Sequence, residues 1–433
     1  MLKKCSGRFQ KTYGVGLHPM PALSEMLAFN PRHLKVFLAV ARAGSVARAA
    51  EVVPRVQSAI TRSIQELEAD LAVPLFERHS HGMLLTEFGA ALRARAESAY
   101  AELDAARESL AALCADARWN ANAPILTLSI GRQRLQVFVE LMKQRHMGTV
   151  AEQFGISQPA VSQALREVEQ GLGLALAART AGGIVPNAAG EQLAFHLRRA
   201  LAELARAREE ILSLQQGITG RVTVGTLSLG RGWLLPQAIT RITQAHPRIR
   251  ISTVEGSFEH LASLLHAGEL DFILGGLRPQ EQMAGFRTHP IFGSGIVLLA
   301  RTGHPLCESL QRDGWRGLEG ARWVLPHRNT WTRSSLEATL AERQLPRAEV
   351  VVETADNTIT RALVMTGDLI TAASPHLFQE EIASGQLAVL PLAPTASPRD
   401  IGIVVRANGT PTVAGRLLIE SVMGAMNGAA VAD

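Results

Sequence analysis

Leu34-Lys-Val-Phe37 recurs as Leu135-Gln-Val-Phe138, and this repeat decides how the first half of the chain folds. The two phenylalanines are 101 positions apart. The same offset relates the residues that follow, without any gap, as far as Leu110. Pairs of identical residues at this offset include Gln57 and Gln158, Glu66 and Glu167, Leu71 and Leu172, Arg78 and Arg179, and Gly89 and Gly190. One register held over this length predicts a single folding unit that occurs twice.

Each copy contains three segments with apolar residues at helical spacing, and a break separates the second segment from the third. The third helix has one apolar face, whereas its opposite face is small and polar. The apolar positions are Ile60, Ile64, Leu67 and Leu71 in copy one, and Val161, Leu165, Val168 and Leu172 in copy two. This arrangement predicts a helix-turn-helix, whose second helix can enter the major groove of DNA. A plain helical hairpin with a solvated polar face has the same spacing and remains an alternative.

The polar face of the third helix supplies the candidate DNA contacts. Serine, threonine and glutamine can form hydrogen bonds with base edges, and arginine can bridge a guanine. The predicted contacts are Gln57, Ser58, Thr61 and Arg62 in copy one, and Gln158, Pro159, Ser162 and Gln163 in copy two.

Ordered motifs around this helix resemble the signature of LysR-type transcription regulators. They are Gln57-Ser-Ala-Ile-Thr-Arg62, Val73-Pro-Leu-Phe-Glu-Arg78 and Leu85-Thr-Glu-Phe-Gly89 in copy one, and Ser157-Gln-Pro-Ala-Val-Ser162 and Leu165-Arg-Glu-Val-Glu169 in copy two. The resemblance implies two winged helix-turn-helix modules, with Arg78 in a wing that touches phosphate and the minor groove. Copy two has Ala177 in place of Phe76, so we expect its wing to be more loosely packed. Copy two is therefore expected either to bind DNA more weakly or to serve partly as a structural partner.

A long helix with an apolar seam follows each wing, and in copy one it is predicted from Thr86 to Cys114. The seam residues are Leu92, Ala96, Ala99, Leu103, Ala106, Leu110 and Leu113, and in copy two Leu193, Leu197, Ala200, Leu204, Ala207, Ile211 and Leu214. Alternating steps of four and three are typical of a coiled-coil pair, although a helix packed on its own domain is the alternative. The resemblance implies antiparallel pairing, for which one chain holds both partners. We predict that Leu103 and Leu204 lie on facing helices and that two chains form a homodimer, whereas pairing between chains would build larger assemblies.

From Gly220 the pattern changes to strands that alternate with helices, which predicts a parallel α/β sheet. The resemblance implies a two-lobed effector domain similar to periplasmic binding proteins, with Ile296–Arg301 and Asp400–Val405 crossing between the lobes. Ligands of such sheets bind at the carboxyl ends of strands and at helix starts. The predicted effector contacts are Thr226, Ser228, Gly276, Thr330, Asn357 and Ser374, with Ser228 and Thr330 on opposite lobes. Each of these residues could instead be an ordinary cap or turn residue.

The fold class expected is therefore α/β overall, with two tandem winged modules before the effector domain. The expected boundaries are a basic N-terminal tail over 1–29, the first module with its linker helix over 30–114, a connector over 115–132, the second module with its linker helix over 133–217, and the effector domain over 220–433. Lobe I is expected over about 220–295 and 406–433, and lobe II over about 302–399. Within the connector, Ile125–Ile130 could add a short strand.

Composition favours a protein that stays in the cytoplasm and has a polyanionic partner. The formal net charge is +5, and the three cysteines lie too far apart to suggest a disulfide framework or a metal site. No apolar run suits a signal peptide or a membrane span. Neither a catalytic motif nor a cofactor-binding loop is recognisable, so we expect no enzyme, cofactor or metal. We predict a regulator that binds double-stranded DNA and is controlled by a small-molecule effector. The alternatives are a small-molecule binding protein whose helical half serves only assembly, and an enzyme built on the two-lobed fold.

Overall fold

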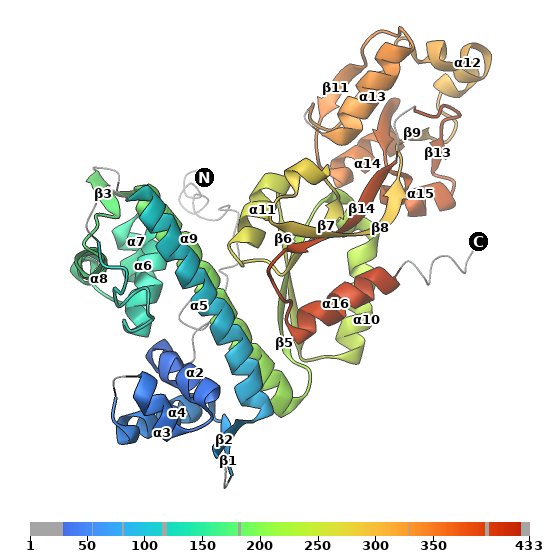
Figure 1. The fold of residues 1–433 in the computed structure, drawn as a ribbon. Helices are drawn as coiled ribbons and strands as arrows, with labels where there is room; N and C mark the ends of the chain where they lie inside the picture. Colours follow the sequence, from blue (N-terminus) through green and yellow to red (C-terminus); the bar gives the residue numbers. More distant parts are fainter. Residues whose placement is uncertain are drawn as a thin grey trace, which may run out of the picture. The chain divides into compact units, whose positions relative to one another are not determined.

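A computed structural model describes residues 29–53, 55–79, 82–114, 119–180, 183–328, 330–394 and 398–425 of the chain. The tail predicted over residues 1–29 therefore lies outside the described residues, apart from Phe29. The chain forms two compact units, Met1–Gly217 and Ile218–Asp433 (Figure 1). Each unit has a hydrophobic core of its own.

The first unit contains the duplicated half of the sequence, and each copy forms three helices, a two-stranded wing and a long linker helix. Equivalent elements have equivalent bounds, since α4 spans Gln57–Leu71 and α8 spans Gln158–Leu172. The other elements of copy one are η1 (Pro31–His33), α2 (Leu34–Ala43), α3 (Val46–Val52), β1 (Phe76–His79), β2 (Gly82–Leu85) and α5 (Glu87–Leu113). Those of copy two are α6 (Arg132–Gln144), α7 (Met147–Phe154), β3 (Ala177–Thr180), β4 (Gly183–Pro186) and α9 (Ala188–Gln216). The prediction of one folding unit present twice is confirmed.

The junction between wing and linker helix shows how different residues build the same structure. Thr86 Oγ1 accepts a hydrogen bond from the amide of Gly89 (3.0 Å) and donates one to the carbonyl of Pro74 (2.7 Å). Asn187 makes both bonds at the equivalent positions of copy two, through Oδ1 (2.9 Å) and Nδ2 (2.7 Å). A Cβ atom on Gly89 would lie 2.1 Å from the carbonyl oxygen of Leu75, and the equivalent distance in copy two is also 2.1 Å. Close backbone approach therefore requires glycine in both copies.

The linker helices α5 and α9 pack against each other along their length, so both partners of the pair belong to one chain (Figure 1). They run antiparallel, because Arg95 contacts Glu210 towards the end of α9, whereas Glu102, further along α5, contacts His196 nearer the start of α9. Every predicted seam position is buried except the last in each helix, Leu113 and Leu214, which are 50% and 44% exposed. Leu103 and Leu204 are fully buried in the core that the two helices share.

The connector between the two copies contains no strand over Ile125–Ile130, and that expectation was wrong. These residues form turns, and three of them, Ile125, Leu126 and Leu128, are buried in the core of the first unit. Side chains of α5 bind carbonyl groups that a strand would have offered to a neighbour: Arg107 Nη2 donates to Leu126 (2.6 Å) and the Tyr100 hydroxyl to Thr127 (3.4 Å). The apolar run therefore packs against the linker helix and does not pair with a sheet.

The second unit contains two five-stranded sheets, each with its own helices. The order of the first is β6-β5-β7-β14-β8, and the order of the second is β11-β10-β12-β9-β13. The first sheet consists of β5 (Gly220–Thr226), β6 (Ile249–Glu255), β7 (Phe272–Gly276), β8 (Phe286–Ser294) and β14 (Arg399–Arg406), with helices η2 (Gly230–Leu234), α10 (Leu235–Ala245), α11 (Phe258–His266), η3 (Gln280–Gln282) and α16 (Val413–Gly424). The second consists of β9 (Val297–Arg301), β10 (Arg322–Leu325), β11 (Glu349–Glu353), β12 (Leu369–Ala373) and β13 (Leu387–Val389), with helices α12 (Leu306–Asp313), η4 (Gly314–Leu318), α13 (Trp331–Glu342), α14 (Asn357–Thr366), η5 (Pro375–Leu377) and α15 (Gln379–Ala383).

The three strands on which the prediction of a parallel sheet rested, β5, β6 and β7, do pair in parallel, but both complete sheets are mixed. In the first sheet, β14 runs antiparallel to β7 and β8, and in the second, β9 runs antiparallel to β12 and β13. The two segments expected to cross between lobes each belong to a single sheet: β9 to the second and β14 to the first. The chain enters the second sheet through β9 and returns to the first through β14, and each of these strands runs antiparallel to its neighbours.

Within the described part of the chain, no helix is long and apolar enough to cross a membrane. The same residues contain no group of three or more histidine, cysteine, aspartate or glutamate side chains placed to hold a metal ion.

Candidate DNA interface and effector site

In copy one, α4 presents the predicted DNA contacts near its start. Gln57, Ser58 and Arg62 are exposed, and Thr61 is half-buried. Arg62 Nε donates to Glu66 Oε1, one turn further along, at 2.9 Å. The Arg62 side chain is 81% exposed, and an ion pair of this kind is weak in water, so the guanidinium can exchange its partner for a base edge.

Copy two presents a different set of side chains on α8. The exposed residues of this face are Gln158, Pro159, Gln163 and Arg166. Gln163 Nε2 donates to Glu167 Oε1 at 3.2 Å, which is the same one-turn contact that arginine makes in copy one. Arg166 Nη2 donates in turn to Gln163 Oε1 at 2.9 Å. Both copies therefore hold polar groups along an exposed helix face, but with arginine at different positions.

Ser162 does not lie where the sequence predicted. It is only 7% exposed, and its Oγ accepts a hydrogen bond from Arg179 Nη2 at 2.5 Å. The position adjoins Val161 at the border of the buried stripe, so the hydroxyl faces the wing and not the outer surface. Ser162 is therefore a partner of the wing residue Arg179. The residue of copy one equivalent to Arg179 is Arg78, which lies on β1, but the Arg78 side chain is outside what the structure describes.

Three predicted effector contacts end or follow strands of the first sheet. Thr226 ends β5, is 1% exposed and donates from Oγ1 to the carbonyl of Val254 at 3.5 Å. Ser228 is half-buried, and its Oγ accepts from Arg231 Nη2 at 3.5 Å. Gly276 ends β7, which runs parallel to β5, so these residues lie at one edge of the sheet.

The other three predicted contacts belong to the second lobe. Thr330 caps α13, since its Oγ1 accepts from the amide of Arg333 at 3.4 Å. Asn357 is the half-buried first residue of α14. Ser374 follows β12, is buried, and its Oγ lies 2.7 Å from Ser294 Oγ at the end of β8. This hydrogen bond joins the two lobes, so Ser374 lies at their junction.

Arg399 is a residue of this region that sequence reasoning missed. Its Nε and Nη2 donate to the carbonyls of Leu277 and Gly276, both at 2.8 Å, and its guanidinium carbon lies 6.0 Å from the ring centre of Trp331 on the second lobe. Among the described residues, no carboxylate forms an ion pair with Arg399. Burial, with a smaller effect of nearby Arg278, lowers the pKa of Arg399 to about 10. Among the described residues the cation therefore has carbonyl and ring contacts but no anionic partner.

The position of Arg399 explains why it was missed. The predicted effector contacts were residues at the carboxyl ends of parallel strands and at helix starts, whereas Arg399 begins β14, which runs antiparallel to its neighbour β7. Ile401 lies opposite Gly276, so the first residue of β14 stands at the edge where β7 ends. In the sequence, the available signal was an arginine immediately before the predicted strand Asp400–Val405.

The Asp356 carboxyl, at the start of α14, has a lowered pKa, and part of the cause is a charge on the first lobe. Backbone hydrogen bonds from Thr358 and Ile359 lower the pKa of the Asp356 carboxyl, and Arg231 lowers it further. Since Arg231 also binds Ser228, the structure brings the first-lobe serine and the start of α14 into one electrostatic environment.

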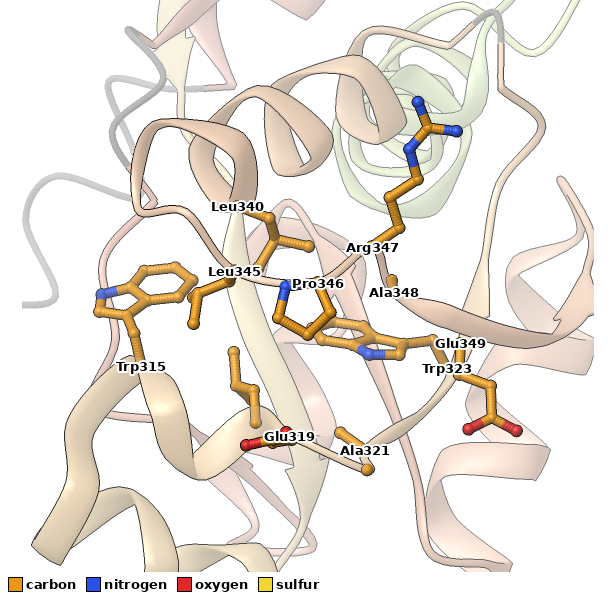
Figure 2. Close-up of a pocket in the computed structure, with 12 residues that line it drawn as sticks. Trp315, Glu319, Ala321, Trp323, Leu340, Leu345, Pro346, Arg347, Ala348 and Glu349 are labelled. Carbon is orange, nitrogen blue, oxygen red and sulfur yellow. The ribbon is translucent and has the colours of Figure 1, made fainter.

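A separate cavity of about 280 Å³ lies within the second lobe (Figure 2). Its apolar walls include Trp315, Trp323, Leu345 and Pro346, and charged side chains such as Glu319 stand at its rim. None of the six predicted effector contacts lines this cavity.

Two family descriptions match most of the chain. "Bacterial regulatory helix-turn-helix protein, lysR family" matches residues 31–90 and again 132–191, and "LysR substrate binding domain" matches residues 215–427. The chain belongs to the LysR family of transcriptional regulators. It is a DNA-binding regulator with an effector-binding domain and is not an enzyme. The resemblance drawn from the sequence motifs is confirmed, and both alternative functions are set aside.

Similar proteins extend this assignment. The LysR-family regulator is 43% identical over 378 residues to the HTH-type transcriptional regulator GalR of Pseudomonas putida, with 87% of this chain and 92% of that protein covered. It is 30% identical over 271 residues to the regulator GbpR of Azospirillum brasilense, with 63% and 79% covered. Among solved structures, ArgP from Mycobacterium tuberculosis has a similar fold, with a TM-score of 0.51 at 17% identity over 68% of this chain and 97% of that one.

Proposed function

We propose that a negatively charged small molecule controls this regulator by binding between the two lobes of its effector domain. The proposed contacts are Thr226, Ser228, Gly276, Thr330, Asn357 and Ser374, together with Arg399. The proposed DNA contacts are Gln57, Ser58, Thr61, Arg62 and Arg78 in copy one, and Gln158, Pro159 and Gln163 in copy two. The observation that carries the effector proposal is the half-buried guanidinium of Arg399, which has no carboxylate partner among the described residues.

An anion at Arg399 would stabilise a charge that burial disfavours. Trp331 approaches the same guanidinium from the second lobe, within the range of a cation–π contact. A ligand held by Arg399 would therefore touch both lobes and favour the arrangement in which they meet. Differential binding of this kind is what allows an effector to shift a conformational equilibrium.

Thermal unfolding of the full chain in the presence of small organic acids tests the site. A ligand that binds the folded state raises Tm, and we expect some acids of the set to do so. Ser228→Val and Arg399→Met are each expected to remove the Tm shift, because they delete a hydrogen-bonding group and the cation. DNA binding without the acid should stay as in the wild type.

Ala348→Phe is the matched control, since it narrows the cavity of Figure 2 and leaves the junction of the lobes unchanged. The Tm shift should persist in this variant. A shift that disappears in Ala348→Phe and persists in Ser228→Val would instead assign the effector to the cavity in the second lobe.

We propose in addition that the regulator acts in the cytoplasm as a homodimer whose chains associate through their effector domains. Each chain brings two DNA-binding modules but one effector domain, so two chains would present four modules. The solution mass should equal that of two chains of 46.6 kDa. A stable tetramer of full-length chains would contradict this assembly.

A further inference from the structure

The two recognition helices of one chain carry different side chains at equivalent positions. At three exposed positions α4 has Ser58, Arg62 and Gln65, whereas α8 has Pro159, Gln163 and Arg166. Arginine is therefore the sixth residue of α4 and the ninth residue of α8, almost one helical turn further along. Since arginine makes the most common specific contact with guanine, the two helices are suited to different base sequences.

The two copies pair through contacts that repeat when the copies are exchanged. Arg95 Nη1 donates to Glu203 Oε2 at 2.9 Å, and both side chains are almost fully buried. The equivalent of Arg95 in copy two is His196, and the equivalent of Glu203 in copy one is Glu102. His196 Nδ1 lies 3.1 Å from Glu102 Oε2. This exchange is what the self-complementary interface of a symmetric dimer shows, here within one chain.

The same network favours pairing of copy one with copy two over pairing of copy two with itself. Arg95 also donates to Glu210, whose equivalent in copy one is Ser109, at 3.4 Å from His196. If two second modules paired with each other, Glu203 and Glu210 of each module would face His196 of the other, which is the equivalent of Arg95. Both carboxylates would then lose Arg95, although Arg206 Nη1 would still bind Glu203 (2.7 Å), and buried carboxylates that lose a guanidinium partner destabilise an interface.

The helix pair sets the separation of the two modules. Helix α5 has 27 residues, which gives a length of about 40 Å at 1.5 Å per residue. Each end of the pair contacts the module of the other copy. Gln215 at the end of α9 donates to the carbonyl of Ala72 after α4 (3.2 Å), and in the connector after α5 the backbone amide of Asn120 donates to the carbonyl of Leu172 at the end of α8 (2.8 Å). The modules therefore stand at opposite ends of the pair (Figure 1). Half-sites about 34–36 Å apart, one turn of DNA, suit this separation.

We propose that a single chain binds a DNA site whose two half-sites differ in sequence, so that the site lacks inversion symmetry. Arg62 contacts one half-site and Arg166 contacts the other, at a different position within it. Two identical modules would instead require an inverted repeat, because the symmetry of the site mirrors that of the protein. The inference rests on the DNA contacts proposed above and adds Arg166 to those of copy two.

Selection of DNA by the full-length chain tests the proposal. The pool is duplex DNA with a random region of about two helical turns, which has room for one pair of half-sites. The expected motif has two half-sites at fixed spacing that are not inverted copies of each other. An inverted repeat would overturn the inference while leaving DNA binding by the regulator intact. A pool without any enriched motif would contradict the proposed DNA contacts themselves.

The triple variant P159S/Q163R/R166Q gives α8 the exposed residues of α4 and sharpens the test. Its selected motif should gain inversion symmetry, since both modules then present the same side chains. Gln170→Ala is the matched control, because it also copies an exposed copy-one residue, Ala69, but lies far from the helix start. The control should select the wild-type motif. A triple variant that also selects the wild-type motif would overturn the assignment of half-site specificity to these residues.

Discussion

Copy one and copy two of the duplicated module share the contacts that shape the backbone. Glu68 Oε1 accepts from the amide of Leu75 at the start of one wing (2.7 Å), and Glu169 Oε1 accepts from the amide of Leu176 in the other (2.8 Å). Several residues that differ face the partner copy, as Arg95 and His196 do in the helix pair, or lie on the exposed face of the third helix. The comparison teaches that the fold of the module depends on a small set of backbone contacts, which leaves pairing and recognition free to change.

The largest expected difference between the copies lies in the helix pair. Arg95→Ala removes the buried cation that binds both Glu203 and Glu210, and Arg206 Nη1 still binds Glu203 (2.7 Å), so the free energy of unfolding should fall by about 3 kcal/mol, the low end for a broken buried pair. His196→Ala should cost only about 1 kcal/mol, because Arg199 Nη2 still binds Glu102 (2.6 Å). Urea unfolding of the full chain followed by circular dichroism measures both losses. Equal losses in the two variants would contradict the asymmetry of the network.

The next difference concerns DNA. Arg62→Ala should weaken binding to the selected DNA by about 1–3 kcal/mol, since it removes the proposed contact between a charged guanidinium and a base edge. Gln163→Ala, at the equivalent position of copy two, should weaken binding less because an amide forms a weaker contact than a guanidinium. Binding isotherms at one salt concentration compare the two variants. An unchanged affinity in Arg62→Ala, with the fold intact, would remove Arg62 from the interface.

A difference in pH dependence should also separate the copies. Burial, together with Arg32, lowers the pKa of His33 below its ordinary value of 6.5, while Glu66 opposes this effect. A depressed histidine pKa means that the unfolded chain binds the proton more readily, so stability is present above pH 6.5 and is lost as pH falls through it. The equivalent residue of copy two is an arginine, Arg134, which pairs with Glu167 (2.9 Å).

Thermal unfolding between pH 7 and pH 5 measures this effect. The fall in Tm with acid should be smaller in His33→Gln than in the wild type. An Arg134→Gln variant should keep the full fall, and the proposal fails if both variants behave alike.

The smallest expected effect concerns the turn after the first helix of each copy. Copy one has Gly44 there in the left-handed region (φ 69°), whereas copy two has Arg145 (φ 58°). A non-glycine residue in this region costs about 1 kcal/mol, so Arg145→Gly should raise the stability of the chain by about that amount. The lost ion pair of Arg145 with Glu191 is exposed and weak. A lower Tm in Arg145→Gly would show that Arg145 makes a contact worth more than the strain.

The sequence predicted those parts of the fold that follow from periodicity and repetition. A constant offset and apolar residues such as Ile60 and Val161 defined the helices of both modules, because helical spacing depends on local sequence. The seam of the linker helices was predicted to within its last step at Leu113 and Leu214.

The parts that were missed depend on contacts between distant residues. The burial of Ser162 requires Arg179 to reach back from the wing, and the place of Arg399 depends on an antiparallel strand returning from the second lobe. The apolar run from Ile125 resembled a strand, but α5 supplied side chains that bind its carbonyl groups. Sequence spacing alone contains none of these tertiary contacts.

Pairing of the two copies within one chain is the central claim, and cross-linking measures it directly. Ser109 and His196 face each other from α5 and α9, so both are replaced by cysteine in a chain whose Cys5, Cys114 and Cys307 are replaced by serine. A short bismaleimide should join the two new cysteines within each chain, so that at every protein concentration the denatured product has single-chain mass, 46.6 kDa, carries one linker and has no free thiol. A cross-linked product of twice that mass would show that the linker helices pair between chains and would contradict the account.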